Sequence, residues 1–175
     1  MAEPDGLPVD AASPSVLRVG PQDWRVYRDV RIASLIDSPR AFRATYAEAS
    51  DRTKEQWRGR LGPDFPTWVA LEGGRPLGTI TLSREPDQAP GEGLLIGMWV
   101  ASAARGAGVA DALVVAALEH ARELGWRRVL LDVAHENRRA EAFYRRFGFA
   151  PTGEVSAAPW NPTITVETLA LDLGP

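Results

Sequence analysis

The chain contains no cysteine, and this absence limits the chemistry that it can perform. Without a thiol there is no disulfide, no thiolate metal ligand and no cysteine nucleophile, so a covalent thioester on the protein is excluded. Histidine is scarce as well, and the two that are present, His120 and His135, lack the paired spacing of metal ligands. We therefore expect no metal site.

The sequence also lacks an excess of positive charge and any apolar run near the length of a membrane span. Its formal net charge is -3 at pH 7, so the composition does not point to a nucleic-acid partner. The first residues lack the basic and then apolar order of a signal peptide. We therefore expect a soluble cytoplasmic protein with neither a nucleic-acid nor a membrane partner.

The length of 175 residues suits one domain with a substantial core and is short for two. Residues 1–15 are rich in proline, aspartate and alanine and show no periodicity, which predicts a flexible N-terminal tail. Residues 16–175 are predicted to form the single domain.

Alternating and helical patterns predict the elements of this domain. Strands are predicted at residues 16–19, 67–71, 77–82, 94–100, 129–133, 149–152 and 163–173. Helices are predicted from an N-cap at Asp23 to before Pro39, after a capping box at Thr53, from a glycine turn to Leu124, and between Asn137 and Gly148. Phe42 and Tyr46 are four residues apart and suggest a further helical turn. Since a strand, a helix and a strand follow in order from residue 94, those two strands should be parallel through a right-handed crossover.

The central feature is a glycine-rich turn between the apolar strand at 94–100 and the longest predicted helix, with the sequence Arg105-Gly106-Ala107-Gly108-Val109-Ala110. The first N–H groups of a helix have no intrahelical partner, and the helix dipole adds partial positive charge at that end. Glycine and alanine leave these amides bare, which favours an anion such as phosphate. Taken alone, so short a motif is equally compatible with a tight turn that binds nothing.

Further residues follow this turn and form a linked set with it. The set comprises Val100, Arg105 to Ala110, Val133, Asn137, Ala140, Phe143, Tyr144, Gly148 and Phe149. In its order and spacing the set resembles the GNAT family of acyl-CoA-dependent N-acetyltransferases, strongly over the second half of the chain and only in element order over the first. The resemblance implies an α/β fold on a mixed sheet: antiparallel N-terminal strands, a splayed central pair of parallel strands with a crossover helix, and antiparallel C-terminal strands.

The resemblance also implies that acetyl-CoA is the cosubstrate and how it is held. The backbone of Met98 and Val100 would pair with the pantetheine arm in the gap between the splayed strands. The pyrophosphate would lie on the turn formed by Arg105, Gly106, Ala107, Gly108, Val109 and Ala110, although the Arg105 side chain could pair instead with a neighbouring acid. The family often has glutamine or arginine two residues before Arg105, where this chain has Ala103. A side-chain contact to phosphate is lost there, but contacts from backbone amides do not depend on the side chain.

Asn137 and Tyr144 are seven residues apart, or two turns of helix, so both project on one side with Cα atoms about 10 Å apart along the axis. By resemblance Asn137 would bind a pantetheine amide, although asparagine is also a good N-cap and both roles can hold together. By resemblance Tyr144 would be the catalytic residue that protonates the departing thiolate. The alternative for Tyr144 is a core position beside Phe143 and Phe147.

The implied reaction is direct attack by a primary amine, of a small molecule or a peptide, on acetyl-CoA in a ternary complex. A base must first take a proton from the ammonium form, and Asp132, His135 and Glu136 lie near the cleft in chain order without any of them being assigned. A backbone N–H near Val100 could polarise the thioester carbonyl. The alternative function is a non-catalytic module that binds and senses acyl-CoA, for which Tyr144 would not be needed. A homodimer is expected only at the level of the family.

The sequence leaves the roles of two groups of side chains open. Trp99 and the loop that carries Trp160 could line an acceptor pocket, whereas Trp57 and Trp68 are predicted to lie in the core. The positive charges of Arg138, Arg139, Arg145 and Arg146 either form a solvated helix face or meet the nucleotide phosphate.

Overall fold

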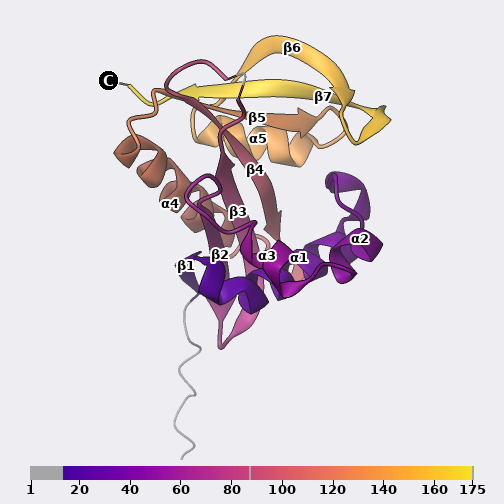
Figure 1. The fold of residues 1–175 in the computed structure, drawn as a ribbon. Coiled ribbons are helices and arrows are strands. Elements are labelled where there is room, and N and C mark those ends of the chain that lie inside the picture. Colours follow the sequence, from indigo (N-terminus) through magenta and orange to yellow (C-terminus); the bar gives the residue numbers. More distant parts are fainter. Residues whose placement is uncertain (1–13, 87, 175) are drawn as a thin grey trace, which may run out of the picture.

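A mixed seven-stranded sheet runs through the computed structural model, which describes residues 14–86 and 88–174 (Figure 1). The strands are β1 (Ser15–Val19), β2 (Thr67–Glu72), β3 (Arg75–Ser83), β4 (Glu92–Val100), β5 (Arg128–Ala134), β6 (Ala150–Ala158) and β7 (Asn161–Asp172). Their order across the sheet is β1-β2-β3-β4-β5-β7-β6. The β4–β5 pair is parallel, whereas its neighbours on both sides pair antiparallel. The α/β fold class and the predicted arrangement of strands are confirmed.

Helices connect these strands in the described part of the chain. The α-helices are α1 (Trp24–Asp37), α2 (Tyr46–Ser50), α3 (Lys54–Arg58), α4 (Val109–Glu123) and α5 (Arg138–Arg146), and the short 3-10 helices are η1 (Pro21–Asp23), η2 (Pro39–Ala41) and η3 (Ser102–Ala104). Helix α4 forms the crossover between β4 and β5, as predicted. It ends where Gly125 takes a φ of +72, a conformation suited to the predicted glycine after a helix.

The helices cover both faces of the sheet. Along β2, Trp68 and Ala70 belong to the core cluster that contains the buried side of α4. Val69, between them, belongs to a second cluster formed with α1 and α3. Because successive side chains of a strand point to opposite faces, α4 lies on one face of the sheet and α1 with α3 on the other (Figure 1).

The segment between α1 and α3 differs from its prediction. Phe42 is not helical but extended, with φ -131 and ψ 150. The helix begins only at Tyr46, because Thr45 and Glu48 form a capping box in which each bonds the backbone N–H of the other. The spacing of the two aromatic residues is therefore a weaker signal here than the capping box of Thr45 and Glu48.

Two other local predictions concern the start of the chain. Asp23 precedes α1 as predicted, but its carboxylate accepts the N–H of Gly20 at 2.9 Å and makes no capping bond to the helix. Of the predicted flexible tail, residues 1–13 lie outside the described residues, and Ser15 already belongs to β1.

The strands β4 and β5 diverge after a short paired stretch. Three residue pairs join them, and the last is Leu94 with Leu130. Beyond that point β4 contains a bulge, since the segment from Ile96 to Trp99 has one residue more than the facing segment of β3. Gly97 in this bulge has a φ of +64, which glycine adopts without strain. Because a bulge bends its strand, the splayed gap implied by the resemblance has a local cause in β4.

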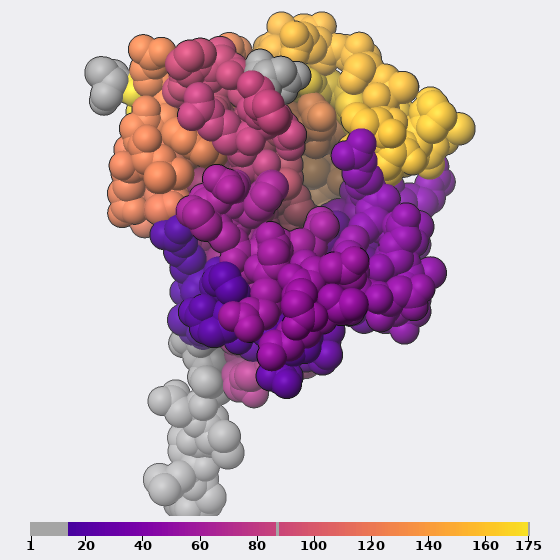
Figure 2. Space-filling view, viewed as in Figure 1, coloured from indigo at the N-terminus to yellow at the C-terminus, as the bar shows by residue number. Residues whose placement is uncertain are grey.

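The surface is hollowed on the side of this divergence. Figure 2 shows a recess between the segment that carries α1 to α3 and the β6–β7 hairpin. Across residues 14–86 and 88–174, the structure contains no helix with the length and apolarity that a membrane crossing requires.

Candidate functional site

The glycine turn lies between η3 and α4 and is exposed. Gly108 is the N-cap of α4 with a φ of +79, and Gly106 has a φ of +85, a region that side chains with a Cβ rarely adopt. A Cβ at either position would meet no atom within 4 Å. Glycine is therefore required here by the shape of the backbone and not by packing against the protein.

The backbone donors of this turn are uncommitted. Among the described residues, the N–H groups of Gly106, Gly108, Val109 and Ala110 donate to no protein acceptor, and that of Ala107 makes one long bond of 3.4 Å to the Ala104 carbonyl. These donors lie at the positive end of the dipole of the 15-residue helix α4. Such a turn fits a phosphate or a diphosphate.

The end of β4 directs backbone groups into the gap beside β5. The N–H of Ala101 donates to the Leu77 carbonyl at 2.8 Å, so these two residues form a hydrogen-bonded pair of the β3–β4 ladder. By the alternation of an antiparallel ladder, the N–H and C=O of the neighbouring Val100 point away from β3. Met98 lies within the bulged segment and is partly buried against the core. The backbone of Val100 and the glycine turn thus lie at the same end of β4.

Asn137 caps α5. Its side-chain Oδ1 accepts the N–H of Ala140 at 3.1 Å, which is the capping role that the sequence left open. The Nδ2 of Asn137 makes no hydrogen bond with the described residues. Since an asparagine side chain can accept with one atom and donate with the other, a contact to a pantetheine amide stays a prediction that this geometry permits.

Tyr144 lies on the inner side of α5 with 6% of its surface exposed. Its ring packs edge-on against Phe143 and Phe149, with centroid distances of 5.1 and 5.6 Å. Burial raises the pKa of the Tyr144 hydroxyl well above its ordinary value of 10.0, so the phenol is neutral at physiological pH. Tyr144 belongs to the main core cluster, against which Phe143 and Phe147 pack, so the core position that the sequence left open is the one observed. Its hydroxyl makes no hydrogen bond to the described residues. A neutral phenol with an uncommitted O–H can act as a general acid.

A carboxylate that the sequence did not single out lies beside the glycine turn. Asp37, the last residue of α1, accepts a hydrogen bond from the Trp99 indole Nε1 at 2.9 Å and one from Arg105 Nη2 at 2.8 Å. Arg105 also donates through Nε to the Val100 carbonyl at 3.0 Å. The sequence left two partners open for the Arg105 side chain, a phosphate and a neighbouring acid. The structure shows the acid, Asp37.

Replacing Asp37 with alanine should lower the free energy of unfolding by about 1–2 kcal/mol, because two charge-assisted donors lose their acceptor at a half-exposed position. The Trp99 hydrogen bond, and after it those of Ser38 and Arg105, hold the pKa of Asp37 below its ordinary value of 3.8. The stabilisation is therefore complete above pH 3.8 and is lost as the pH falls through the lowered pKa. Urea denaturation of wild type and Asp37→Ala at pH 7 and pH 3 measures the difference in their free energy of unfolding. An undiminished difference between the two proteins at pH 3 would contradict the role of the charge.

A cavity of about 280 Å³ lies between η2 and the loop from β5 to α5. Residues 38–41 line it on one side, and Ala134, Glu136 and Asn137 line it on the other. The indole Nε1 of Trp160, in the β6–β7 turn, donates to the Arg40 carbonyl at 3.3 Å. The cavity therefore adjoins the N-terminal end of α5, and its volume offers room for a small molecule beside Asn137.

The other sequence candidates lie outside this site or on its rim. Trp57 and Trp68 are core residues as predicted, with 1% and 6% of their surface exposed. Asp132 is exposed and accepts the Thr168 hydroxyl at 2.8 Å, on β5 and β7. The arginines of α5 mostly pair with acids: Arg138 and Arg145 with Glu141, and Arg146 with Asp111 in the first turn of α4. These pairs favour the solvated helix face over a phosphate contact.

Comparisons with known proteins agree with this geometry. A family model described as the acetyltransferase (GNAT) family matches residues 32–149. The mycothiol acetyltransferase of Cellulomonas flavigena is 33% identical over 156 residues, which cover 85% of this chain and 42% of that protein. N-acetyltransferase 8 of Rattus norvegicus is 33% identical over 111 residues, which cover 62% of this chain and 49% of that protein. This chain thus spans half or less of the length of these two relatives.

The fold is also found among solved structures. The acetyltransferase of the GNAT family from Streptococcus pneumoniae has a TM-score of 0.75 to this chain at 20% sequence identity. The matched region covers 92% of this chain and 99% of that chain. At this level of identity the likeness shows a common fold over nearly the whole of both molecules.

Proposed function

Because the chain belongs to the acetyltransferase (GNAT) family, we propose that it transfers the acetyl group of acetyl-CoA to a primary amine by direct attack in a ternary complex. The observation that carries the proposal is the set of four uncommitted backbone donors at the glycine turn, beside the divergence of β4 and β5. A turn that only reversed the chain would need neither the free donors nor the gap.

The residues of this chain would divide the work of holding the cosubstrate. The N–H groups of residues 106–110 would hold the pyrophosphate, and the backbone of Met98 and Val100 would pair with the pantetheine arm in the gap. Asn137 would donate a hydrogen bond to the pantetheine arm through its Nδ2, since its Oδ1 already accepts the Ala140 N–H. Since Arg105 is bound to Asp37 and to the Val100 carbonyl, its part is to hold the end of β4 against α1.

Acetyl-CoA supplies the acetyl group and a thiolate leaving group, and the protein has to position the amine and return a proton to the thiolate. Tyr144 would give that proton, because its O–H is neutral and free of protein partners. The cavity beside Asn137 offers room for an acceptor, which can be a small molecule or a peptide amine.

The alternative is a module that binds acyl-CoA and senses it without turnover. Both functions need the glycine turn, whereas only the enzyme needs a proton donor at the gap. The neutral Tyr144 hydroxyl, which makes no hydrogen bond to the described residues, favours the enzyme, since a tyrosine retained only for packing gains nothing from an unpaired O–H.

Acetyl-CoA should raise the melting temperature, because a ligand that binds the native state stabilises it by mass action. At a concentration of 100 times the Kd, the expected shift is roughly 5–10 °C. A panel of amines and peptides should then release free thiol from acetyl-CoA with at least one acceptor. No thermal shift at millimolar acetyl-CoA would rule out both the enzyme and the sensor, and a shift without turnover on any amine would favour the sensor.

A further inference from the structure

The cavity between η2 and the loop from β5 to α5 combines two opposite charges. It has a volume of about 280 Å³, and Arg40 and Glu136 are the charged residues of the described chain that line it. Arg40 belongs to η2 on one side, and Glu136 belongs to the loop on the other. The cavity therefore has a guanidinium-bearing residue on one side and a carboxylate-bearing residue on the other.

Neither of these side chains is committed within the described part of the chain. Arg40 and Glu136 form no ion pair with a described residue, and although they line the same cavity they do not pair with each other. The hydrogen bond at Arg40 uses its backbone carbonyl and does not involve the guanidinium. Both charges are therefore available to a ligand, which would bridge the gap between them.

Hydrogen bonds hold the backbone on both sides of this cavity. The N–H of Asn137 donates to the Ala134 carbonyl at 2.8 Å, which closes the turn that carries Glu136. On the other side, the Trp160 indole Nε1 donates to the Arg40 carbonyl at 3.3 Å. This contact joins the two segments that flank the recess in Figure 2. The two charged residues are therefore carried by backbone that is held in place.

The remaining lining limits the chemistry of an occupant. Pro39, Ala41 and Ala134 are apolar, and each charged residue has at least one of them on its own side. The complementary ligand carries an ammonium and a carboxylate on a short apolar body. A polyamine would bring further positive charge toward Arg40, and a phosphorylated amine would bring further negative charge toward Glu136, so both fit less well.

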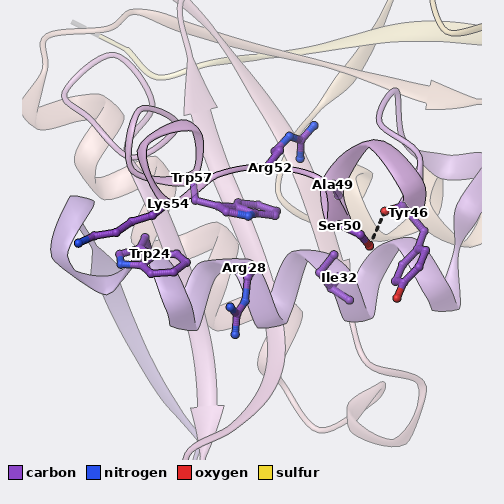
Figure 3. Close-up of a pocket in the computed structure, with 9 residues that line it drawn as sticks. All are labelled: Trp24, Arg28, Ile32, Tyr46, Ala49, Ser50, Arg52, Lys54 and Trp57. Atoms are coloured by element: carbon purple, nitrogen blue, oxygen red, sulfur yellow. Dashed lines mark hydrogen bonds between the residues drawn. The ribbon is translucent and has the colours of Figure 1, made fainter.

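Another cavity of comparable size does not combine charges in this way. It has a volume of about 310 Å³ and lies between α1 and the segment that carries α2 and α3 (Figure 3). The charged residues of the described chain that line it are all cations, namely Arg28, Arg52 and Lys54. Figure 3 shows these three side chains pointing in different directions. The pairing of a cation with an acid thus distinguishes the cavity at η2.

We propose that the cavity at η2 binds a free amino acid as the acceptor, with its ammonium at Glu136 and its carboxylate at Arg40. A guanidinium donates two parallel hydrogen bonds to a carboxylate, and a carboxylate accepts those of an ammonium. Glu136 immediately precedes Asn137, the residue proposed to contact pantetheine, so this orientation brings the amine to the side of the cosubstrate. The inference rests on the proposed acetyl transfer and names the class of acceptor.

An amino acid held in this way reacts through its amine nitrogen. The nitrogen forms an amide bond to the acetyl carbon as the bond between that carbon and sulfur breaks. Of the two protons that the ammonium gives up, one replaces the proton that Tyr144 is proposed to give to the thiolate, and the other goes to solvent. The products are an N-acetyl amino acid and CoA.

Binding is tested first without acetyl-CoA, by titrating wild type with each of the standard amino acids under saturation-transfer NMR. At least one amino acid should bind. Its carboxamide, and the corresponding acid without the amine, should each bind about tenfold or more weakly, because each has lost one charged partner. No binding by any amino acid, or equal binding by an amino acid and its carboxamide, would overturn the inference.

Two variants assign the two ends of the ligand. Arg40→Gln should weaken the amino acid about tenfold or more and leave the affinity for the carboxamide unchanged. Glu136→Gln should weaken the amino acid to a similar extent and leave the affinity for the acid without the amine unchanged. Both variants should melt at the wild-type temperature, since neither side chain pairs with the described residues. Unchanged amino acid affinity in both variants would also overturn the inference.

Arg43→Gln and Glu154→Gln are the matched controls. Arg43 and Glu154 are exposed and do not line this cavity, and they form no ion pair with the described residues. Both controls should bind the amino acid as wild type does. A loss of affinity in the controls equal to that in the cavity variants would show a general effect of surface charge and count against the site.

Turnover separates this inference from the proposed function. With acetyl-CoA present, thiol release should be fastest with the amino acids that bind. If amino acids bind as expected but no amine or amino acid releases thiol, the acetyl transfer fails while the binding site stands. If amines without a carboxylate react as well as amino acids do, the acetyl transfer stands and the inference is overturned.

Discussion

Acetyl-CoA should bind about a hundredfold more weakly to the Gly108→Asp variant, a loss of about 2.7 kcal/mol. The substitution places a carboxylate at the N-cap of α4, among the free N–H groups that are proposed to hold the pyrophosphate. Like charges in contact repel, and the carboxylate itself competes for the same donors. Isothermal titration calorimetry with acetyl-CoA and with CoA measures the loss.

The fold should tolerate this change, because a Cβ at Gly108 meets no atom within 4 Å. The remaining cost is that of an aspartate in a left-handed conformation, about 1 kcal/mol. Gly74→Asp is a matched control, since Gly74 has the same φ of +79 and the same open surroundings in the β2–β3 turn. Equal cofactor affinity in the two variants would remove the glycine turn from the binding site.

Turnover should fall about a hundredfold or more in the Tyr144→Phe variant, while the affinity for acetyl-CoA stays within about twofold. The substitution removes only the hydroxyl that is proposed to protonate the departing thiolate. Because that hydroxyl makes no hydrogen bond to the described residues and phenylalanine keeps the packing of the ring, the stability at pH 7 should change little. Steady-state kinetics with thiol detection and calorimetry on the same preparations separate chemistry from binding.

A second measurement on Tyr144→Phe tests the environment of the phenol. The raised pKa of Tyr144 means that the unfolded chain loses this proton first as the pH rises. The contribution of Tyr144 to the free energy of unfolding is therefore complete below pH 10.0. Above pH 10.0 it declines by up to about 1.4 kcal/mol per pH unit until the pKa of the folded state is reached. Wild type should lose stability relative to the variant over this range. An unchanged turnover in Tyr144→Phe would leave the hydroxyl without a catalytic role.

Much of the fold was predictable because its signals are local. The apolar run at 94–100, the glycine turn and the pattern of α4 follow one another within 31 residues, so strand, crossover and parallel strand could be predicted from order alone. The bulge in β4 also has a local signal, since Gly97 interrupts an apolar strand. By contrast, Phe42 was misplaced because tertiary packing and the Thr45 capping box outweigh the spacing of two aromatics.

The sequence by itself determined the class of fold, the position of the glycine turn and the linked residues Asn137 and Tyr144, because backbone conformation, capping and periodicity depend on near neighbours. Only the tertiary structure decided that Asp37 meets Trp99 and Arg105, residues 62 and 68 positions away. Electrostatic partners are chosen by proximity in space, and helix packing sets that proximity through contacts that no pattern along the chain records.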